Sequence, residues 1–402
     1  MTALADPRAD FPLLQRTVDA GRLVYLDNAA TTLKPHSVID AIAGYYGTVG
    51  ANIHRGKHIL SEEASERYEQ VRARIAERLG VPPRNVVFTA GTTEGINLVA
   101  AGLPLKETDL VALPVDAHHS AQLPWRGRCR TTWLAAGEHT TVHEESFQAV
   151  LESRPRVVVL TAASNVTGHT ADVDRLAALA HEAGAWTVVD AAQLVPHRLP
   201  RVTAGIDALA FSAHKMLGPT GIGVLCLSDR LIEAITPDRL GGGTVDWADQ
   251  AGYRLRRAPY RFEAGTPNIS GVYGFGAALE YLDRTGADTV VARDAELLTA
   301  LLEQVRDRPY LTALGGLGDR GRIPVLTVTL RGVPDPSAIA RALSDSYGVM
   351  CRSGHFCAQP YFTAHDHTAG LRIAPYLYNT REDIEYAFTA LDEVHRLLAR
   401  SV

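Results

Sequence analysis

The sequence predicts an α/β protein with an open, mostly parallel, doubly wound sheet, and three observations support this prediction. Short apolar runs bounded by Gly, Pro or polar residues recur between about residues 85 and 227, as buried strands do. Segments with helical periodicity separate these runs, so strand and helix alternate. Polar residues gather where the runs end, which is the edge at which such sheets hold ligands.

The 402-residue chain has the composition of an ordinary globular protein, with 46% hydrophobic and 21% charged residues. Its net charge of −5 is spread along the chain without a basic block, so nucleic acid is not an implied partner. No apolar run reaches membrane-spanning length, and the N-terminus has no signal-peptide core, so no membrane partner is expected. The 4 cysteines are too few and too scattered for a disulfide framework, which predicts a reducing, cytoplasmic compartment.

The first part of the chain, residues 1–24, has no clear periodicity, and the segment YLDNAATT then pairs a short strand with a turn of small residues. Helical spacing predicts helices at 35–46 and 61–79, with Ser61 as the N-cap of the second. An apolar run predicts a strand at 85–89. The AGTTEGIN segment after it predicts a helix N-terminus that presents free N–H groups beside Thr92 and Thr93. These two threonines are either a phosphate site or simple caps.

Apolar runs predict the strands that follow, and helical periodicity predicts the helices between and after them. Residues 120–155 have no readable pattern. A change of pattern near residue 285 divides the chain into an N-terminal segment 1–24 that packs with the small domain, a large domain 25–285 and a small C-terminal domain 286–402. The strands are expected at 110–115, 156–161, 186–189, 208–211 and 325–330, and the helices at 172–183, 271–282, 292–305, 337–347 and 381–399.

An acid and a lysine stand at the ends of successive predicted strands. Asp190 ends one strand, and Lys215 comes just past the next. Taken alone, Asp190 would be interpreted as a helix N-cap or a salt-bridge partner, and Lys215 as a solvated surface lysine. However, Ser212 and His214 precede Lys215, and a glycine-rich turn follows it. This pattern favours a site for pyridoxal phosphate, which needs a lysine for its Schiff base and a carboxylate that keeps its ring nitrogen protonated.

The segment VMCRSGHFCAQPY contains Cys351 and Cys357. For Cys357 three interpretations compete, namely a buried structural thiol, a zinc ligand and a nucleophile. The zinc hypothesis lacks a paired CxxC and a justified spacing, so no metal is predicted. The Gly-rich turn and the positive Arg352 and Arg372 favour the thiolate, and with it the nucleophile. The thiols predicted to be structural are Cys129, Cys226 and Cys351.

Together these motifs resemble the cysteine desulfurases of the class V aminotransferase-like group, in particular the Suf-type branch that serves sulfur mobilisation and its selenocysteine lyase relatives. The resemblance implies a homodimer of the pyridoxal-phosphate-dependent fold type I, with the cofactor between a large and a small domain and a site completed by both subunits. The matching segments run in order from residue 25 to about 380 and are YLDNAATT, IHRGKH, GTTEGIN, HHSAQLPW, SNVTG, VDAAQ, FSAHKMLGPTGIG, RFEAGTPN, SGHFCAQP and RIAPYLYNT.

The resemblance implies roles residue by residue. Lys215 matches the Schiff-base lysine, Cys357 the sulfur-accepting cysteine, and His118 the histidine that stacks on the cofactor ring. The other cofactor contacts that it implies are Thr92, Thr93, Asp190, Gln193, Ser212, His214 and, from the second subunit, Thr266. The substrate contacts that it implies are Ala29, His54, Asn165, Arg352 and Arg372.

The implied reaction converts L-cysteine, or L-selenocysteine, to L-alanine and leaves a persulfide on Cys357 that passes to a protein sulfur acceptor. The alternatives are a C–S β-lyase, an epimerase or an aminotransferase of the same fold, none of which needs Cys357, and a non-catalytic scaffold. Three departures from the branch bear on the acceptor and the substrate range: Glu-His-His-Ala-Asn is replaced at Ala117 and Ala121, the usual second His of Gly-His-His-Cys is Phe356, and Cys351 is an extra thiol. Whether the sulfur serves iron–sulfur assembly or a thio-metabolite stays open.

Overall fold

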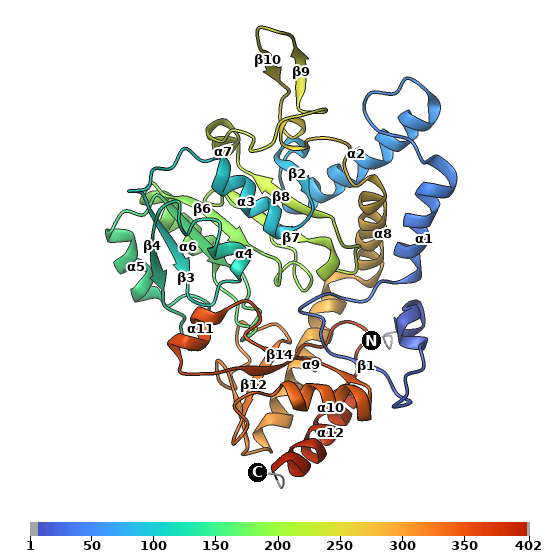
Figure 1. Ribbon diagram of the computed structural model, residues 1–402, viewed down its shortest axis with the longest axis vertical. Coiled ribbons are helices and arrows are strands. Elements are labelled where there is room, and N and C mark those ends of the chain that lie inside the picture. Colours follow the sequence, from blue (N-terminus) through green and yellow to red (C-terminus); the bar gives the residue numbers. More distant parts are fainter. Residues whose placement is uncertain (1–6, 400–402) are drawn as a thin grey trace.

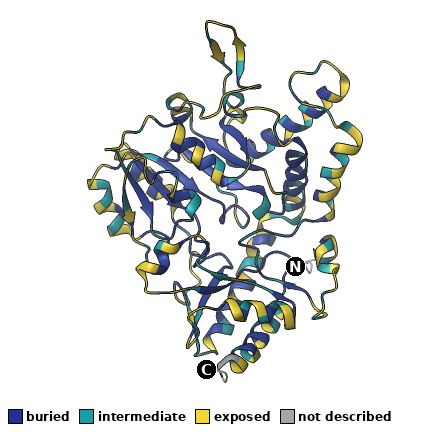
Figure 2. Cartoon of the chain, viewed as in Figure 1, coloured by how far each residue is buried: buried dark blue, intermediate teal, exposed yellow. Residues whose placement is uncertain are grey.

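The structure, a computed structural model, describes residues 7–399 and shows a large and a small α/β unit stacked along the long axis (Figure 1). Residues 1–6 of the predicted N-terminal segment lie outside the described residues. Buried residues concentrate on the strands of both units and on the helix faces turned toward them, while the outer helix faces are exposed (Figure 2). Among residues 7–399, no helix is both long and apolar enough to cross a membrane.

A seven-stranded sheet forms the centre of the large unit, in the order β2-β8-β7-β6-β5-β3-β4. Its neighbouring strands are parallel except around β8, which runs antiparallel to β2 and β7, so the predicted mostly parallel sheet is confirmed. The strands are β2 (Val86–Thr89), β3 (Leu110–Pro114), β4 (Arg130–Leu134), β5 (Val157–Thr161), β6 (Trp186–Asp190), β7 (Ala208–Ser212) and β8 (Gly223–Leu227).

Apolar side chains on both faces explain why the central strands read as continuous apolar runs. Along β5, Val158 and Leu160 belong to one hydrophobic cluster, and Val157 and Val159 belong to the cluster on the opposite face. The helices of the large unit are α1 (His36–Gly44), α2 (Ile59–Leu79), α3 (Thr92–Gly102), α4 (His119–Gln122), α5 (Glu144–Glu152), α6 (Val173–Glu182), α7 (Asp229–Ala234) and α8 (Ile269–Thr285).

The cap predicted for α2 is wrong. The N-cap is His58, whose ring accepts a hydrogen bond from the Ser61 backbone N–H. The Ser61 hydroxyl instead donates to the Asn52 carbonyl at 2.8 Å, so it ties the preceding loop to the helix. A histidine ring nitrogen can therefore serve the free N–H groups of a first turn where a serine was expected.

The small unit is built on a four-stranded antiparallel sheet in the order β11-β12-β15-β14. The chain also enters through this unit: β1 (Val24–Tyr25) pairs in parallel with β13 (Val349–Met350), and Val24 and Leu26 pack in the small unit's core. The remaining elements are β11 (Leu311–Ala313), β12 (Leu326–Leu330), β14 (Arg352–Gly354), β15 (Gly370–Ile373), α9 (Ala287–Arg306), α10 (Ser337–Tyr347), α11 (Gln359–Ala364) and α12 (Arg381–Ala399).

Two features have no counterpart in the sequence-based expectations. The stretch 120–155 contains β4 and α5, and β4 escaped notice because it is an edge strand whose residues are mostly exposed or half-buried. A hairpin of β9 (Val245–Ala248) and β10 (Tyr253–Leu255) projects beyond the large unit (Figure 1). Its Trp247 and Tyr253 side chains are 50% and 57% exposed.

Candidate active site

A cavity of about 350 Å³ lies at the carboxyl ends of β6 and β7, beside the N-terminus of α3 and against the loop before α11. Strand ends at one sheet edge and a segment of the small unit meet there, as ligand sites in open α/β sheets do. Its lining residues are Ala29, Ala30, Thr31, Thr92, Thr93, His118, Ser120, Asn165, Asp190, Ala192, Gln193, Ser212, His214, Lys215, Thr220, Arg352, Phe356, Cys357 and Arg372.

One end of the cavity is suited to an anion. The Thr92 N–H at the start of α3 donates to the Ser212 hydroxyl at 2.8 Å, and the hydroxyls of Thr92 and Ser212 lie 2.7 Å apart. A Cβ at Gly91 would come within 3.2 Å of the Ser212 hydroxyl, and one at Gly223 would lie 2.6 Å from the Cα of Gly91. The two glycines therefore allow tight packing of the chain around Ser212, and the hydroxyls and helix N–H groups gathered there fit a phosphate.

Lys215 lies in the depth of the same cavity. Burial lowers the pKa of its amine to about 8, although the charge of Asp190 acts in the opposite direction. Burial also raises the pKa of Asp190, whose carboxylate accepts a hydrogen bond from the Ala192 N–H at 3.0 Å. A lysine with this pKa is partly neutral near pH 7, so it can act as a nucleophile and as a base.

His118 forms a side wall of the cavity. Burial and then the positive charge of Lys215 lower the pKa of His118 to about 3, so its ring is neutral at physiological pH. Its Nδ1 accepts a hydrogen bond from the Ser120 N–H at 3.1 Å, which places the ring proton on Nε2. Ser120, whose hydroxyl also bonds to that of Thr93 at 2.7 Å, was missed in the sequence. Its position two residues after His118 is the signal that could have found it.

Arg372 provides an immobilised cation at the same cavity. The residue is 2% exposed, and its guanidinium donates to the Asn165 carbonyl at 3.1 Å and to Asp27 at 3.1 Å. The other carboxylate oxygen of Asp27 pairs with Arg352 at 3.0 Å. Asp27 is a second residue that the sequence did not reveal as part of the site. A guanidinium held in this way is preorganised for a carboxylate.

The loop that carries Cys357 is strained and is tied to the large unit. Phe356 and Cys357 have φ values of 53° and 59°, a left-handed conformation that costs a non-glycine residue roughly 1–2 kcal/mol. Two hydrogen bonds from the large unit hold it: Asn165 Nδ2 donates to the Phe356 carbonyl at 2.7 Å, and the His119 N–H donates to the Cys357 carbonyl at 2.8 Å. The thiol of Cys357 is thus fixed at the cavity.

The other three cysteines lie away from the cavity. Burial raises the pKa of Cys226 and of Cys351 to about 12, and burial also raises that of Cys129, so their thiolates are scarce at neutral pH. Across residues 7–399, no group of three or more His, Cys, Asp or Glu side chains could hold a metal ion.

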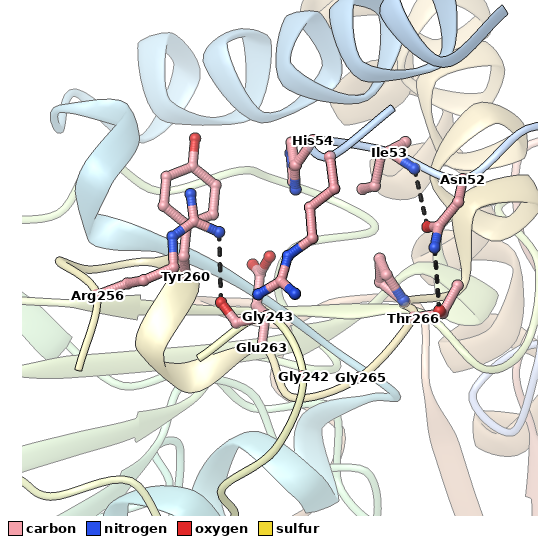
Figure 3. Close-up of a pocket in the computed structure, with 12 residues that line it drawn as sticks. Asn52, Ile53, His54, Gly242, Gly243, Arg256, Tyr260, Glu263, Gly265 and Thr266 are labelled. Atoms are coloured by element: carbon pink, nitrogen blue, oxygen red, sulfur yellow. Dashed lines mark hydrogen bonds between the residues drawn. The ribbon is translucent and has the colours of Figure 1, made fainter. Parts of the chain in front are cut away.

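Two of the predicted site residues lie elsewhere. His54 and Thr266 line a second pocket of about 220 Å³, in which Asn52 Nδ2 donates to the Thr266 hydroxyl at 3.4 Å (Figure 3). The His54 ring bonds to Glu69 at 2.9 Å. All the other predicted site residues line the cavity around Lys215.

A buried carboxyl two residues before His118 in the chain predicts a pH-dependent stability. Asp116 is 1% exposed, its Oδ1 has no hydrogen-bond partner, and burial raises its pKa to about 7. Because the unfolded chain has the lower pKa, the folded state binds the extra proton, and this contribution to stability is lost as pH rises from about 4 to 7. We expect Asp116→Asn to raise Tm by a few degrees at pH 8 and by less as pH falls.

The measurement is a series of thermal melts between pH 4.5 and 8, with Glu107→Gln at an exposed site as the control. A Tm difference for Asp116→Asn that stays the same at every pH, or that widens toward acid, would contradict this assignment of the proton.

Comparison with known proteins gives consistent matches. The family model for class-V aminotransferases matches residues 24–387. The chain is 37% identical to a cysteine desulfurase from Enterobacter sp. (strain 638), with 97% of this chain and 98% of the relative covered, and 36% identical to one from Shigella flexneri over the same shares. Among solved structures, it is similar to the apo form of a cysteine desulfurase from Thermococcus onnurineus NA1 (TM-score 0.91, 32% identity, 98% and 100% of the two chains). It is also similar to an S-sulfonic acid form of an Escherichia coli cysteine desulfurase (TM-score 0.88, 33% identity, 99% of each chain).

Proposed function

The chain belongs to the class-V aminotransferase family, and from this premise we propose that it is a cysteine desulfurase that uses pyridoxal phosphate to convert L-cysteine to L-alanine. One observation carries the proposal: Lys215 and the exposed Cys357 line the same cavity. Cys357 lies close enough that its negative charge acts to raise the pKa of Lys215, against the larger lowering by burial. An epimerase or aminotransferase needs the lysine but has no use for a fixed thiol at the cavity.

The residues present fit the cofactor. Thr92 and Ser212 at the N-terminus of α3 suit its phosphate, and Lys215 beside Asp190 suits its aldehyde carbon and its ring nitrogen. When bound, the cofactor supplies an electron-accepting ring for charge that develops on the substrate's Cα. Asp190 would keep the ring nitrogen protonated, and the neutral His118 would offer its flat face to the ring.

The chain's own groups then orient the substrate and move its protons. Arg372, with Asn165 beside it, binds the carboxylate of L-cysteine. Lys215, whose pKa of about 8 leaves part of the amine neutral, takes the Cα proton. Asp27 holds the guanidinium of Arg372 in place while the carboxylate docks.

Sulfur transfer requires a bond to the substrate sulfur. The Cys357 thiolate attacks that sulfur, a new S–S bond forms, and the Cβ–S bond breaks. The electron pair of the broken bond stays with the substrate carbon, which takes up a proton and becomes the methyl group of alanine. Cys357 retains the sulfur as a persulfide, so one L-cysteine gives one L-alanine and one transferable sulfur.

The test is intact-protein mass spectrometry after incubation of the purified holoenzyme with L-cysteine, with alanine assayed in the same sample. We expect one added sulfur on Cys357 that a thiol removes, accompanied by alanine. The Cys357→Ala variant is expected to form neither. Pyruvate and free sulfide without a modified Cys357 would instead establish a β-lyase and overturn the proposal.

The sulfur is then passed to a protein acceptor, as a further part of the proposal. Both carbonyl oxygens of the Phe356–Cys357 pair are bound by the large unit, so the cysteine is not free to carry its sulfur away. The Cys357 side chain is exposed, which supports an acceptor that brings its own nucleophile to the cavity.

We extend the proposal to a homodimer whose second copy completes each site. His54 and Thr266 lie in a pocket apart from Lys215, and we assign this pocket to the contact with the neighbouring copy (Figure 3). Two chain segments of this pocket, 52–55 and 242–243, lead into α2 and β9, and each of these elements exposes a large apolar side chain, Ile59 at 69% and Trp247 at 50%. Exposed apolar side chains on neighbouring segments are a common mark of an interface.

Sedimentation velocity tests the dimer. We expect the wild-type chain to sediment as a dimer and Ile59→Lys to weaken the dimer at least tenfold, because a charge would be buried in the apolar contact. Val291→Lys, at a site on α9 that is 51% exposed, is the matched control and is expected to leave the dimer intact. A monomeric wild-type chain would refute the shared site.

A further inference from the structure

One backbone carbonyl beside Lys215 receives an unusual number of donors. The oxygen of His214 accepts hydrogen bonds from the Thr32 N–H at 3.0 Å, the Thr31 hydroxyl at 3.0 Å, the Thr32 hydroxyl at 3.2 Å and the Lys34 ammonium at 3.1 Å. A carbonyl oxygen has two lone pairs, so four donors converge where one or two would satisfy it. The three donor residues belong to a single short segment, 31–34.

The same segment also holds the chain on the other side of the lysine. The Leu217 N–H donates to the Thr32 hydroxyl at 2.8 Å. Leu217 has a φ of 66°, a left-handed conformation that is costly for a leucine. Residues 31–34 therefore grip the backbone one residue before and two residues after Lys215, and they stabilise a turn that leucine would not adopt unaided.

Lys34 is the charged member of this grip. Its ammonium is bonded to the Thr31 hydroxyl at 3.0 Å, to the Thr32 carbonyl and to the His214 carbonyl, so its three N–H groups have three oxygen partners. Among the ion pairs of residues 7–399, none involves Lys34, and burial lowers its pKa to about 8. Because the Lys34 ammonium donates to two backbone carbonyls and one hydroxyl, we assign it a structural role in fixing the backbone.

The residue type at position 34 is informative as well. The chain has 40 lysines and arginines, and four of these are lysines. In a chain that uses arginine for most of its cations, two of the four lysines, Lys34 and Lys215, lie at this turn. The compact ammonium of Lys34 donates to three oxygens around it, whereas a guanidinium presents its donors in a fixed planar fork.

We propose that Lys34 is a positioning residue that, with Thr31 and Thr32, fixes the backbone of Lys215 so that its amine enters the cavity between Asp190 and Cys357. The kinetic part of this inference rests on the proposed function. The structural part, a rigid turn at 214–217, holds for the cofactor-free protein as well.

The first test is amide hydrogen exchange on the cofactor-free protein, followed by mass spectrometry of the peptide that contains Met216–Gly218. We expect Lys34→Met to accelerate exchange in this peptide at least tenfold and to leave peptides of α10 and α12 unchanged. Lys106→Met, at an exposed site, is the control for loss of a lysine. Unchanged exchange at 216–218, or faster exchange throughout the protein, would overturn the proposal.

The second test is steady-state kinetics of the holoenzyme with L-cysteine. Because the carboxylate is bound by Arg372 and not by this turn, Lys34→Met should lower kcat at least tenfold and change KM less than twofold. Lys34→Arg keeps the charge but changes the geometry, so it should resemble Lys34→Met, and full activity in Lys34→Arg would overturn a positional role. Thr31→Val removes one donor and should give a smaller effect in the same direction.

These tests separate two failures. If the wild-type enzyme makes no alanine from L-cysteine, the proposed function is wrong, while the exchange experiment still decides whether Lys34 holds the turn. If alanine forms normally in Lys34→Met and the exchange is also unchanged, only the positioning role is wrong.

Discussion

Replacing Lys215 by alanine is expected to lower alanine formation from L-cysteine by about 10⁴-fold or more, because in the proposed mechanism this one side chain both binds the cofactor covalently and moves the Cα proton. Burial lowers its pKa to about 8, so the amine is expected to be partly neutral near pH 7. The same variant should lose the visible absorbance that a lysine-bound cofactor gives. Absorbance spectra and an alanine assay on the purified variant check both effects together.

Lys106→Ala is the matched control, since this exposed lysine lies outside the cavity. The rate at which the cofactor-free wild-type chain takes up pyridoxal phosphate should rise with pH through about 8 and then level off, whereas an ordinary lysine would give a rise near 10.4. A Lys215→Ala chain that keeps more than a hundredth of the activity would contradict the assignment.

Replacing Arg372 by glutamine is expected to have the second largest effect. We expect kcat/KM for L-cysteine to fall by about 10²–10³-fold. The change removes the guanidinium that would bind the substrate carboxylate, and it leaves Asp27 without one of its two partners; loss of one member of a buried charged pair costs about 3–5 kcal/mol. Lys would keep the charge without the fork that reaches both Asp27 and Asn165, so Arg372→Lys should recover little.

Cysteamine, which is L-cysteine without its carboxylate, provides the decisive comparison. The wild-type enzyme should strongly prefer L-cysteine, and Arg372→Gln should narrow that preference because it acts only on the carboxylate. Arg352→Gln should have a smaller effect, because Arg352 is half exposed whereas Arg372 is buried. An unchanged preference in Arg372→Gln would place the carboxylate elsewhere.

The sheet and the part of the cavity around Asp190, Ser212, His214 and Lys215 followed from the sequence, because side-chain chemistry and strand position coincide there, whereas the resemblance implied most of the other cavity residues. The strands around Asp190 and Lys215 are buried on both faces, so their apolar runs are unambiguous, and polar residues at their ends point to one edge. Edge strand β4 and the exposed hairpin β9–β10 lack such a pattern because few of their side chains are buried.

Local sequence patterns do not predict contacts between segments that are far apart in the chain. The residues next to Asp27 in the sequence do not predict its ion pairs with Arg352 and Arg372. Those two arginines become neighbours only when β14 and β15 pair in the sheet of the small unit. Ser120 and the grip of residues 31–34 on the His214 carbonyl are likewise products of tertiary packing. The family resemblance alone implies a role for His54 and Thr266, and within a single chain both lie in a pocket apart from Lys215.

The pairing of β1 with β13 has a consequence for the order in which the enzyme assembles during synthesis. Val24 pairs with Val349, and Asp27 forms a β-bridge with Ala374. The first strand of the chain can therefore pair only after the ribosome has synthesised residues in the last quarter of the chain. Residues 91–215, which contain the anion end and the lysine, are complete long before that point. Because domains fold as their residues emerge, we expect a nascent chain to acquire the lysine half of its site first and the cysteine half last.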